Sequence, residues 1–317
     1  MVQGASEPMV FRGVCRHWPI VQRGLTSPMA VADYLRSIDT HAPHLVVETE
    51  PKERGRIFFN DDLSGFNFRT AKMSLTELVD ALLAEAEKSE PRGLYMYVEL
   101  QQLPGFTSDN ARELAGLGAV RTLLVSNRAC NAAHFDSPQN LPCNLVGERT
   151  FTLFPPEQIS NLYPGPLGTS PFGGQDLCMV DFRAIDEVRF PKAKVAWAAA
   201  QQVRLTPGDV LFLPSMWFHH IEAHSRFNVL MPHWWRDSPE WLGRPEYALQ
   251  HAALSLRDLP KAQRQAWKAL FNHFVFDHDE HFPDYLPPQA RGLLASPMTE
   301  ETARSLRAKL GSRLQRG

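Results

Sequence analysis

The chain has 317 residues, 44% of them hydrophobic and 21% charged, which is the balance of an ordinary globular protein. Its formal net charge of −2 argues against the broad basic surface of a nucleic-acid-binding protein and against an acidic solvating tail. The 25 prolines favour a loop-rich β protein, because proline is excluded from helix interiors and from central strands.

The cysteines and the amino terminus predict a cytoplasmic protein. No two of the four cysteines form a CxxC pair, which argues against zinc-ribbon and thioredoxin-like sites. Scattered thiols fit a reducing compartment. The first residues lack the basic and apolar regions of a signal peptide, and no run approaches about 18 uncharged apolar residues, so no membrane partner is expected.

The first 90 residues predict short strands mixed with helices. A turn is expected at residues 17–19. The clearest helix covers residues 74–90, where Ser74 and Glu77 have the spacing of a capping box and leucines recur at helical intervals. The remaining predicted elements are strands at residues 8–13, 42–50 and 55–60 and a helix at residues 28–38.

From residue 93 to about residue 236 the pattern changes to short strands punctuated by glycine and proline, which predicts an antiparallel barrel or jelly roll. Residues 157–195 form a long predicted loop, which we expect to cover or shape a site. The expected strands lie at residues 93–100, 119–127, 132–156, 200–214, 217–224 and 226–235.

The last part of the chain predicts three helices, at residues 245–259, 261–276 and 299–315. We therefore expect a main domain over residues 1–237 and a helical region over residues 238–317. Its apolar side chains would pack on the barrel or form a two-fold dimer, and the dimer is favoured because two-fold symmetry is the commonest in oligomers. These side chains are Leu254, Trp267, Leu270, Phe271 and Phe274.

A histidine and an aspartate lie two residues apart in "HFD", at His134 and Asp136. Alternate residues of a strand share a face, so the pair could supply two metal ligands, or it could be a surface pair without a task. Two imidazoles and one carboxylate make the facial triad of non-haem iron(II) oxygenases. A third ligand would come from a later strand, where His219, His220 and His224 are candidates.

Two segments resemble the Jumonji-C, or cupin-like, family of Fe(II)- and 2-oxoglutarate-dependent dioxygenases. They are "HFDSPQNLPCNLVGERTFTLFPP" (134–156) and "PGDVLFLPSMWFHHIE" (207–222), and the resemblance extends over roughly residues 8–290. They are most similar to bacterial cupin-like proteins in the branch of the asparaginyl hydroxylase of hypoxia-inducible factor. The resemblance implies a mainly β fold, with a double-stranded β-helix (jelly-roll, cupin) core, flanking helices and a helical carboxyl-terminal region.

The resemblance also implies an iron site. His134, Asp136 and His219 would be the Fe(II) ligands and the catalytic centre. His220 would point the other way, because adjacent strand residues face opposite sides, and a shift of one residue is the main alternative.

For 2-oxoglutarate, the lysine that binds the distal carboxylate in this family falls on Arg149, which could instead be a surface arginine beside Glu148. Arginine preserves the chemistry through its bidentate fork. One departure is Pro232, which stands where the family has an amide side chain. The other cofactor-binding candidates are Tyr95 and Tyr97, which counting does not separate, with Asn131, Asn140 and Trp234.

The predicted activity is therefore hydroxylation of a side chain in a protein or peptide substrate, with Fe(II) and 2-oxoglutarate as cofactors. Three alternatives stay open: a non-catalytic, metal-binding cupin with a regulatory role, a different cupin enzyme that does not use 2-oxoglutarate, and an enzyme that modifies RNA. The near-neutral charge disfavours the RNA substrate. A homodimer through the carboxyl-terminal helices is implied by the resembling hydroxylase.

Overall fold

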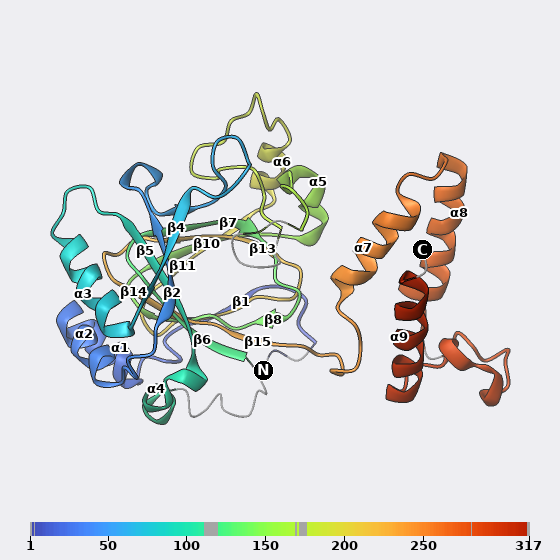
Figure 1. Cartoon of the computed structure of the whole chain (residues 1–317), viewed down its shortest axis with the longest axis horizontal. Helices are drawn as coiled ribbons and strands as arrows, with labels where there is room; N and C mark the ends of the chain where they lie inside the picture. Colours follow the sequence, from blue (N-terminus) through green and yellow to red (C-terminus); the bar gives the residue numbers. More distant parts are fainter. Residues whose placement is uncertain are drawn as a thin grey trace. The chain divides into compact units, whose positions relative to one another are not determined.

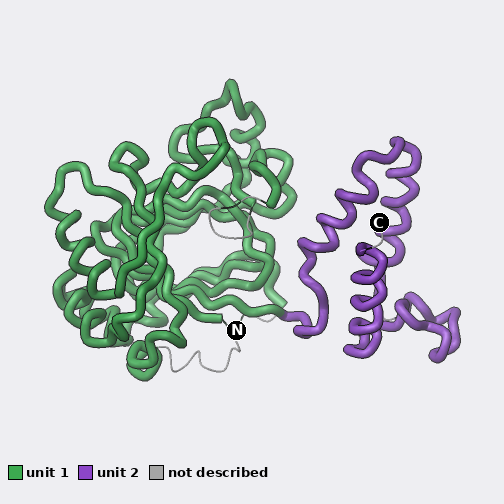
Figure 2. Tube along the Cα trace, viewed as in Figure 1, with its two compact units in different colours: residues 1–236 green, residues 237–317 purple. Residues whose placement is uncertain are grey.

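The computed structural model describes residues 2, 4–110, 120–168, 170, 176–279 and 281–315. The chain divides into two compact units, Met1–Arg236 and Asp237–Gly317 (Figure 2). No helix in the described ranges combines the length and the apolar character needed to cross a membrane.

The first unit is built on two β-sheets, as the cupin prediction requires (Figure 1). All neighbouring strands are antiparallel except β3 and β7. The ten-stranded sheet runs β1 (Met9–Phe11), β12 (Val210–Phe212), β9 (Cys143–Val146), β14 (Asn228–Met231), β6 (Val120–Ser126), β5 (Gly93–Glu99), β2 (His44–Thr49) and β4 (Phe68–Met73), with β15 (His233–Trp235) and β8 (Gln139–Asn140) beside this path. The five-stranded sheet runs β11 (Gln201–Leu205), β10 (Arg149–Phe154), β13 (Phe218–Ala223), β7 (Ala129–His134) and β3 (Arg56–Ile57). The predicted mainly β, jelly-roll fold is confirmed.

Each face of the larger sheet buries a different apolar cluster. In β6, Leu123 and Val125 pack against the flanking helices, whereas Leu124 between them packs toward the second sheet, as the two-residue period of a strand requires. The helices that cover the outer face are α1 (Pro19–Thr26), α2 (Pro28–Ser37) and α3 (Leu75–Ala86), and α4 (Pro104–Asp109) follows β5 (Figure 1). The space between the sheets holds the site.

Local sequence signals explain part of this unit. Helix α3 begins where the capping box predicted it, with Ser74 accepting from the Glu77 backbone and Glu77 accepting from the Ser74 backbone. Helix α1 was missed, because only a turn was predicted at residues 17–19, although Pro19 starts the helix. Strand β4 was also missed, because it is partly exposed and shows little apolar alternation. Short 3-10 turns occur at Pro51–Glu53, Leu100–Gln102 and Pro156–Gln158.

The segment predicted as a long loop carries two short helices, α5 (Ile159–Leu162) and α6 (Ala193–Ala198). Its described residues include Phe182 and Phe190, which pack with Phe154 and Phe218 in a separate apolar cluster. Phe154 and Phe218 are paired residues of β10 and β13, so the segment lies against the five-stranded sheet.

The second unit contains the three predicted helices, α7 (Pro245–Leu256), α8 (Lys261–Phe271) and α9 (Glu300–Leu314). A π-helical turn, Asn272–Phe276, follows α8, and 3-10 turns occur at Pro288–Ala290 and Gly292–Leu294. Thr299 caps α9 by accepting from the Thr302 backbone. Among its described residues, only Pro283 and Ala303 are buried.

Candidate metal centre

The two histidines of the predicted site lie on neighbouring strands. His134 is the last residue of β7, and His219 is the second residue of β13, where the two pair directly. Asp136 lies beyond the end of β7, so the prediction that it shares a strand face with His134 was wrong. A backbone hydrogen bond from Met216 to the Asp136 carbonyl, 2.9 Å long, ties this turn to the loop before β13.

A β-bulge in β7 sets the direction of His134. His219 pairs with His134, but Ile221, two residues on, pairs with Asn131, three residues back. The extra residue in β7 turns His134 to the same side as Asn131, although residues three apart in a regular strand face opposite sides. Both side chains therefore line one cavity.

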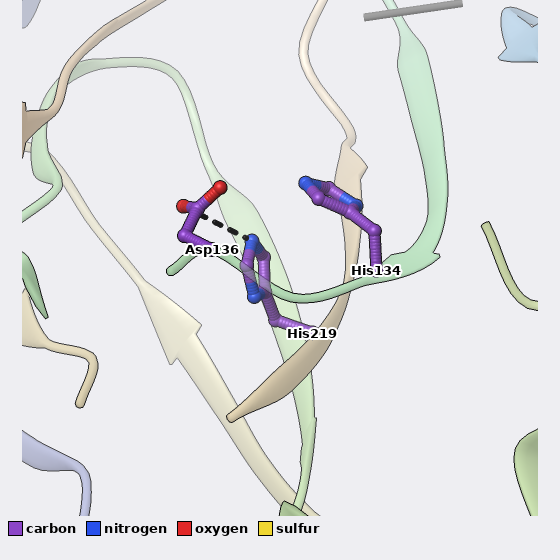
Figure 3. A group of neighbouring side chains, drawn as sticks. All are labelled: His134, Asp136 and His219. Atoms are coloured by element: carbon purple, nitrogen blue, oxygen red, sulfur yellow. Dashed lines mark ion pairs between the residues drawn. The ribbon is translucent and has the colours of Figure 1, made fainter. Parts of the chain in front are cut away.

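The three predicted ligands converge in the buried interior (Figure 3). One ligand atom from each of His134, Asp136 and His219 lies within 4.8 Å of the others. The two imidazole centroids are 4.3 Å apart, and His219 Nε2 lies 3.8 Å from Asp136 Oδ2. In the part of the chain that the structure describes, no other group of these residue types could hold a metal ion.

Backbone carbonyls orient both imidazoles. Nδ1 of His134 lies 2.8 Å from the Ala132 carbonyl, and Nδ1 of His219 lies 3.1 Å from the Trp217 carbonyl. A carbonyl only accepts, so Nδ1 of each ring carries a proton, and Nε2 is the nitrogen left to offer a lone pair to a metal. Burial, and then repulsion from His134, lower the pKa of His219 to about 4, so it is neutral at pH 7.

The neighbouring histidines do not join this cluster. His220 lies on the other face of β13, 3.9 Å from Cys130 Sγ and 3.4 Å from Glu222 Oε1. Burial would lower the pKa of His220, but these two neighbours raise it to about 9. His224 is exposed and bonds to Thr150 Oγ1 at 2.8 Å.

A cavity of about 520 Å³ contains the three-residue cluster. The long segment at residues 157–195, which we expected to shape a site, contributes no described residue to its lining. Apolar side chains such as Leu45, Val47 and Phe151 form much of the remaining wall. Eight of the nine predicted site residues line it: Tyr95, Tyr97, Asn131, His134, Asp136, Asn140, His219 and Trp234.

Arg149, the ninth, is a buried cation on β10. It is 3% exposed, and its Nε and Nη2 atoms have no hydrogen-bond partner among the described residues. Burial lowers the pKa of Arg149 to about 10. Glu148 pairs with Arg204, so the alternative of a surface arginine beside Glu148 was wrong. A cation buried in this way requires an anion for its stabilisation.

The structure separates the two tyrosines. Tyr95 is buried, and its hydroxyl lies 3.5 Å from Asn131 Nδ2. Tyr97 is 44% exposed, and its ring centroid lies 6.1 Å from that of Trp234. Tyr95 therefore belongs to the floor of the cavity and Tyr97 to its rim.

Asn140 and Trp234 contact a metal-ligand candidate. Asn140 Nδ2 donates to Asp136 Oδ2 over 3.0 Å, and Trp234 Nε1 donates to the same oxygen over 2.9 Å. Sequence reasoning found both residues by resemblance but missed this contact, because residues 136 and 234 are brought together only by the tertiary fold. Their predicted role in cofactor binding stays a prediction.

The chain is similar over restricted regions to longer eukaryotic proteins. A lysine-specific demethylase, JMJ31 of Arabidopsis thaliana, is 25% identical over 38% of this chain and 22% of its own length. Jumonji C domain-containing protein 5 of Drosophila melanogaster is 23% identical over 73% of this chain and 55% of its own length. The tRNA wybutosine-synthesizing protein 4 of Gibberella zeae is 25% identical over 69% of this chain and 21% of its own length.

The sequence model of the cupin-like domain family matches residues 2–240. This region contains both sheets and the whole His134, Asp136 and His219 cluster. The match and the Jumonji-type relatives agree with the geometry described above, and the chain therefore belongs to the Jumonji-C, cupin-like family.

Proposed function

We propose that this protein is an Fe(II)- and 2-oxoglutarate-dependent oxygenase that hydroxylates a side chain of a protein substrate. The observation that carries the proposal is Arg149, a buried guanidinium with unpartnered nitrogens in a barrel that also holds a His-Asp-His cluster. The Jumonji-C, cupin-like family to which the chain belongs includes oxygenases that use this metal and this cosubstrate.

The residues fit a divalent metal. Two imidazoles and one carboxylate would hold Fe(II) and leave coordination positions open. Nearby apolar side chains limit the access of water to the cluster. When bound, iron with 2-oxoglutarate and O₂ supplies the oxidant for hydroxylation of a C–H bond, with succinate and CO₂ as the other products.

The residues also fit a dicarboxylate. Arg149 would pair with the distal carboxylate through two parallel hydrogen bonds, which satisfies its buried nitrogens. Tyr95 and Asn131, joined at 3.5 Å on the cavity floor, would supply further donors to the cosubstrate. These contacts would hold 2-oxoglutarate in one orientation and would replace the water that its carboxylates lose.

A protein substrate is proposed from the relatives. One relative is named a lysine-specific demethylase, so a protein side chain is one kind of target among these proteins. The relative named for wybutosine synthesis in tRNA keeps an RNA substrate in the screen described below, although the net charge of −2 disfavours it. An intact ligand cluster argues against a non-catalytic binding module.

We also propose a cytoplasmic homodimer. The four cysteines are unpaired thiols, which suits a reducing compartment.

The proposed dimer surface is an apolar stripe along α8 and the π turn that follows it. The stripe has helical spacing and consists of Trp267, Leu270 and Phe274, each over 40% exposed. A second copy would bury this stripe, so sedimentation of the wild type should give twice the mass of one chain. The double variant Trp267→Glu, Leu270→Glu should sediment with the mass of a single chain. A wild-type monomer would refute the dimer.

The function is tested by succinate formation. Purified protein receives Fe(II), ascorbate and 2-oxoglutarate, and then pools of peptides or of tRNA, beside a His134→Ala control. Turnover that peptides stimulate and His134→Ala abolishes is the expected result. Stimulation by tRNA alone would replace the protein substrate with RNA. Failure of the metal-loaded protein to bind 2-oxoglutarate would refute the oxygenase and favour the non-catalytic module.

A further inference from the structure

One carboxylate oxygen of Asp136 receives two side-chain hydrogen bonds. Trp234 Nε1 lies 2.9 Å from Oδ2, and Asn140 Nδ2 lies 3.0 Å from it. Trp234 of β15 and Asn140 of β8 are direct partners across the two strands, so their side chains share a face. Asp136 and Asn140 are each 5% exposed, so both bonds lie in a region of low dielectric constant, where they are strong.

The chemistry of the donors fixes their orientation. An ionised carboxylate only accepts, so the amide of Asn140 must turn Nδ2 toward Asp136. Asn140 Oδ1 is buried without a hydrogen-bond partner among the described residues, so the contact with Asp136 is the one that this amide side chain makes. The indole of Trp234 has only a donor to offer.

The two bonds restrict the orientation of the Asp136 carboxylate. A rotation of the carboxylate would break both hydrogen bonds to Oδ2, because the donors come from paired residues of β8 and β15. The restricted carboxylate faces the cluster, since Oδ2 lies 3.8 Å from His219 Nε2.

We propose that Asn140 and Trp234 are positioning residues, which hold the Asp136 carboxylate in one orientation for the binding of a divalent metal. This inference rests on the proposed function, because it takes the cluster to be a metal centre. It gives both residues a different task from the cofactor contact that the resemblance implied.

The test is a titration of the full chain with Co²⁺, followed by calorimetry and by the visible absorption of the bound ion. Trp234→Phe keeps the ring and removes the N–H, and Asn140→Ala and Asn140→Ser remove the amide. Trp235→Phe is the matched control. The ring centroid of Trp235 lies 6.2 Å from that of Phe212, and Trp235 packs against the apolar cluster that the flanking helices cover. We expect each site variant to bind Co²⁺ about 10-fold more weakly or worse, with a changed spectrum, and the control to match the wild type.

Each result decides the inference. Site variants that melt earlier without the metal but keep wild-type Co²⁺ affinity and spectrum would overturn it, since the two bonds would then be merely structural. A wild type that binds Co²⁺ no better than His134→Ala would refute the metal centre itself, and the positioning role with it. Weaker binding in Asn140→Ser and Trp234→Phe, both conservative changes, would support the positioning role.

Discussion

Replacing Arg149 with methionine should separate the binding of 2-oxoglutarate from the stability of the fold. The side chain is 3% exposed and its Nε and Nη2 atoms are unpartnered, so its charge is a cost in the free protein. Burial lowers the pKa of Arg149 from its ordinary value to about 10, which corresponds to about 3 kcal/mol against the charged form, at about 1.4 kcal/mol per pKa unit. Below pH 10 the folded protein carries this cost, and a methionine of similar length removes it.

Two opposite effects are therefore expected from Arg149→Met. The free energy of unfolding without cosubstrate should stay equal or rise by about 1–3 kcal/mol, because an unpaired buried charge is replaced by apolar packing. The affinity for 2-oxoglutarate should fall at least about 10-fold, because a hydrogen bond to a charged group contributes about 1.5–3 kcal/mol and Arg149 offers two. Urea denaturation and calorimetric titration of the metal-loaded protein measure the two quantities.

The control for this variant is Arg204→Met. Arg204 lies on the neighbouring strand β11 with its side chain 64% exposed, and it pairs with Glu148 at the surface. The Arg204→Met variant should bind 2-oxoglutarate with the affinity of the wild type. A large loss of stability in Arg149→Met without cosubstrate would show that the guanidinium has a structural partner, and the reasoning from an unpaired cation would be refuted.

Three further predictions concern the scaffold. Gly147→Ala should lower the free energy of unfolding by more than about 2 kcal/mol, because φ is +76° and the new Cβ would lie 2.3 Å from Asn228 Oδ1; Gly243→Ala, with open space around it, is the control for urea melts. Ser74→Ala should cost about 1 kcal/mol through loss of the capping box, and equal stability of mutant and wild type would contradict that bond. Burial opposes, but backbone and side-chain hydrogen bonds prevail in lowering the pKa of Asp209. Asp209→Asn should therefore be less stable than the wild type at pH 7, and the difference should shrink as the pH falls through the lowered pKa. A difference that does not change with pH would refute the electrostatic cause.

The sequence predicted which side chains come together better than it predicted the backbone that positions them. His134 and His219 could be predicted because the HxD motif and a later histidine-containing strand resemble the family pattern. The choice of His219 over His220 followed from the alternation of side chains along a strand. The position of Asp136 in a turn could not be found, because the end of β7 depends on its pairing with β13. The bulge that turns His134 inward is likewise set by the partner strand and has no local signal in "NAAH".

The outer elements show the same limit. The start of helix α3 was predicted to the residue, because its capping box is a local feature, but the helix ends at Ala86 and not at residue 90. Strand β4 pairs with β2 over six residues but is partly exposed, so tertiary pairing and not periodicity makes it a strand. The division into a main domain over residues 1–237 and a helical region over residues 238–317 stays a prediction about independent folding.

Pro232 gains a structural explanation from the strand order. It lies between β14 and β15, and a proline has no N–H with which to continue a ladder. Before it, β14 pairs with β9 and β6; after it, β15 pairs with β8 and β6. The change of partner from β9 to β8 is what places Trp234 opposite Asn140, where both donate to Asp136. Pro232 thus lies where the strand changes partner and brings two donors onto Asp136. Because Pro232 also lines the cavity, we expect it to affect both the orientation of Asp136 and the space beside the three-residue cluster.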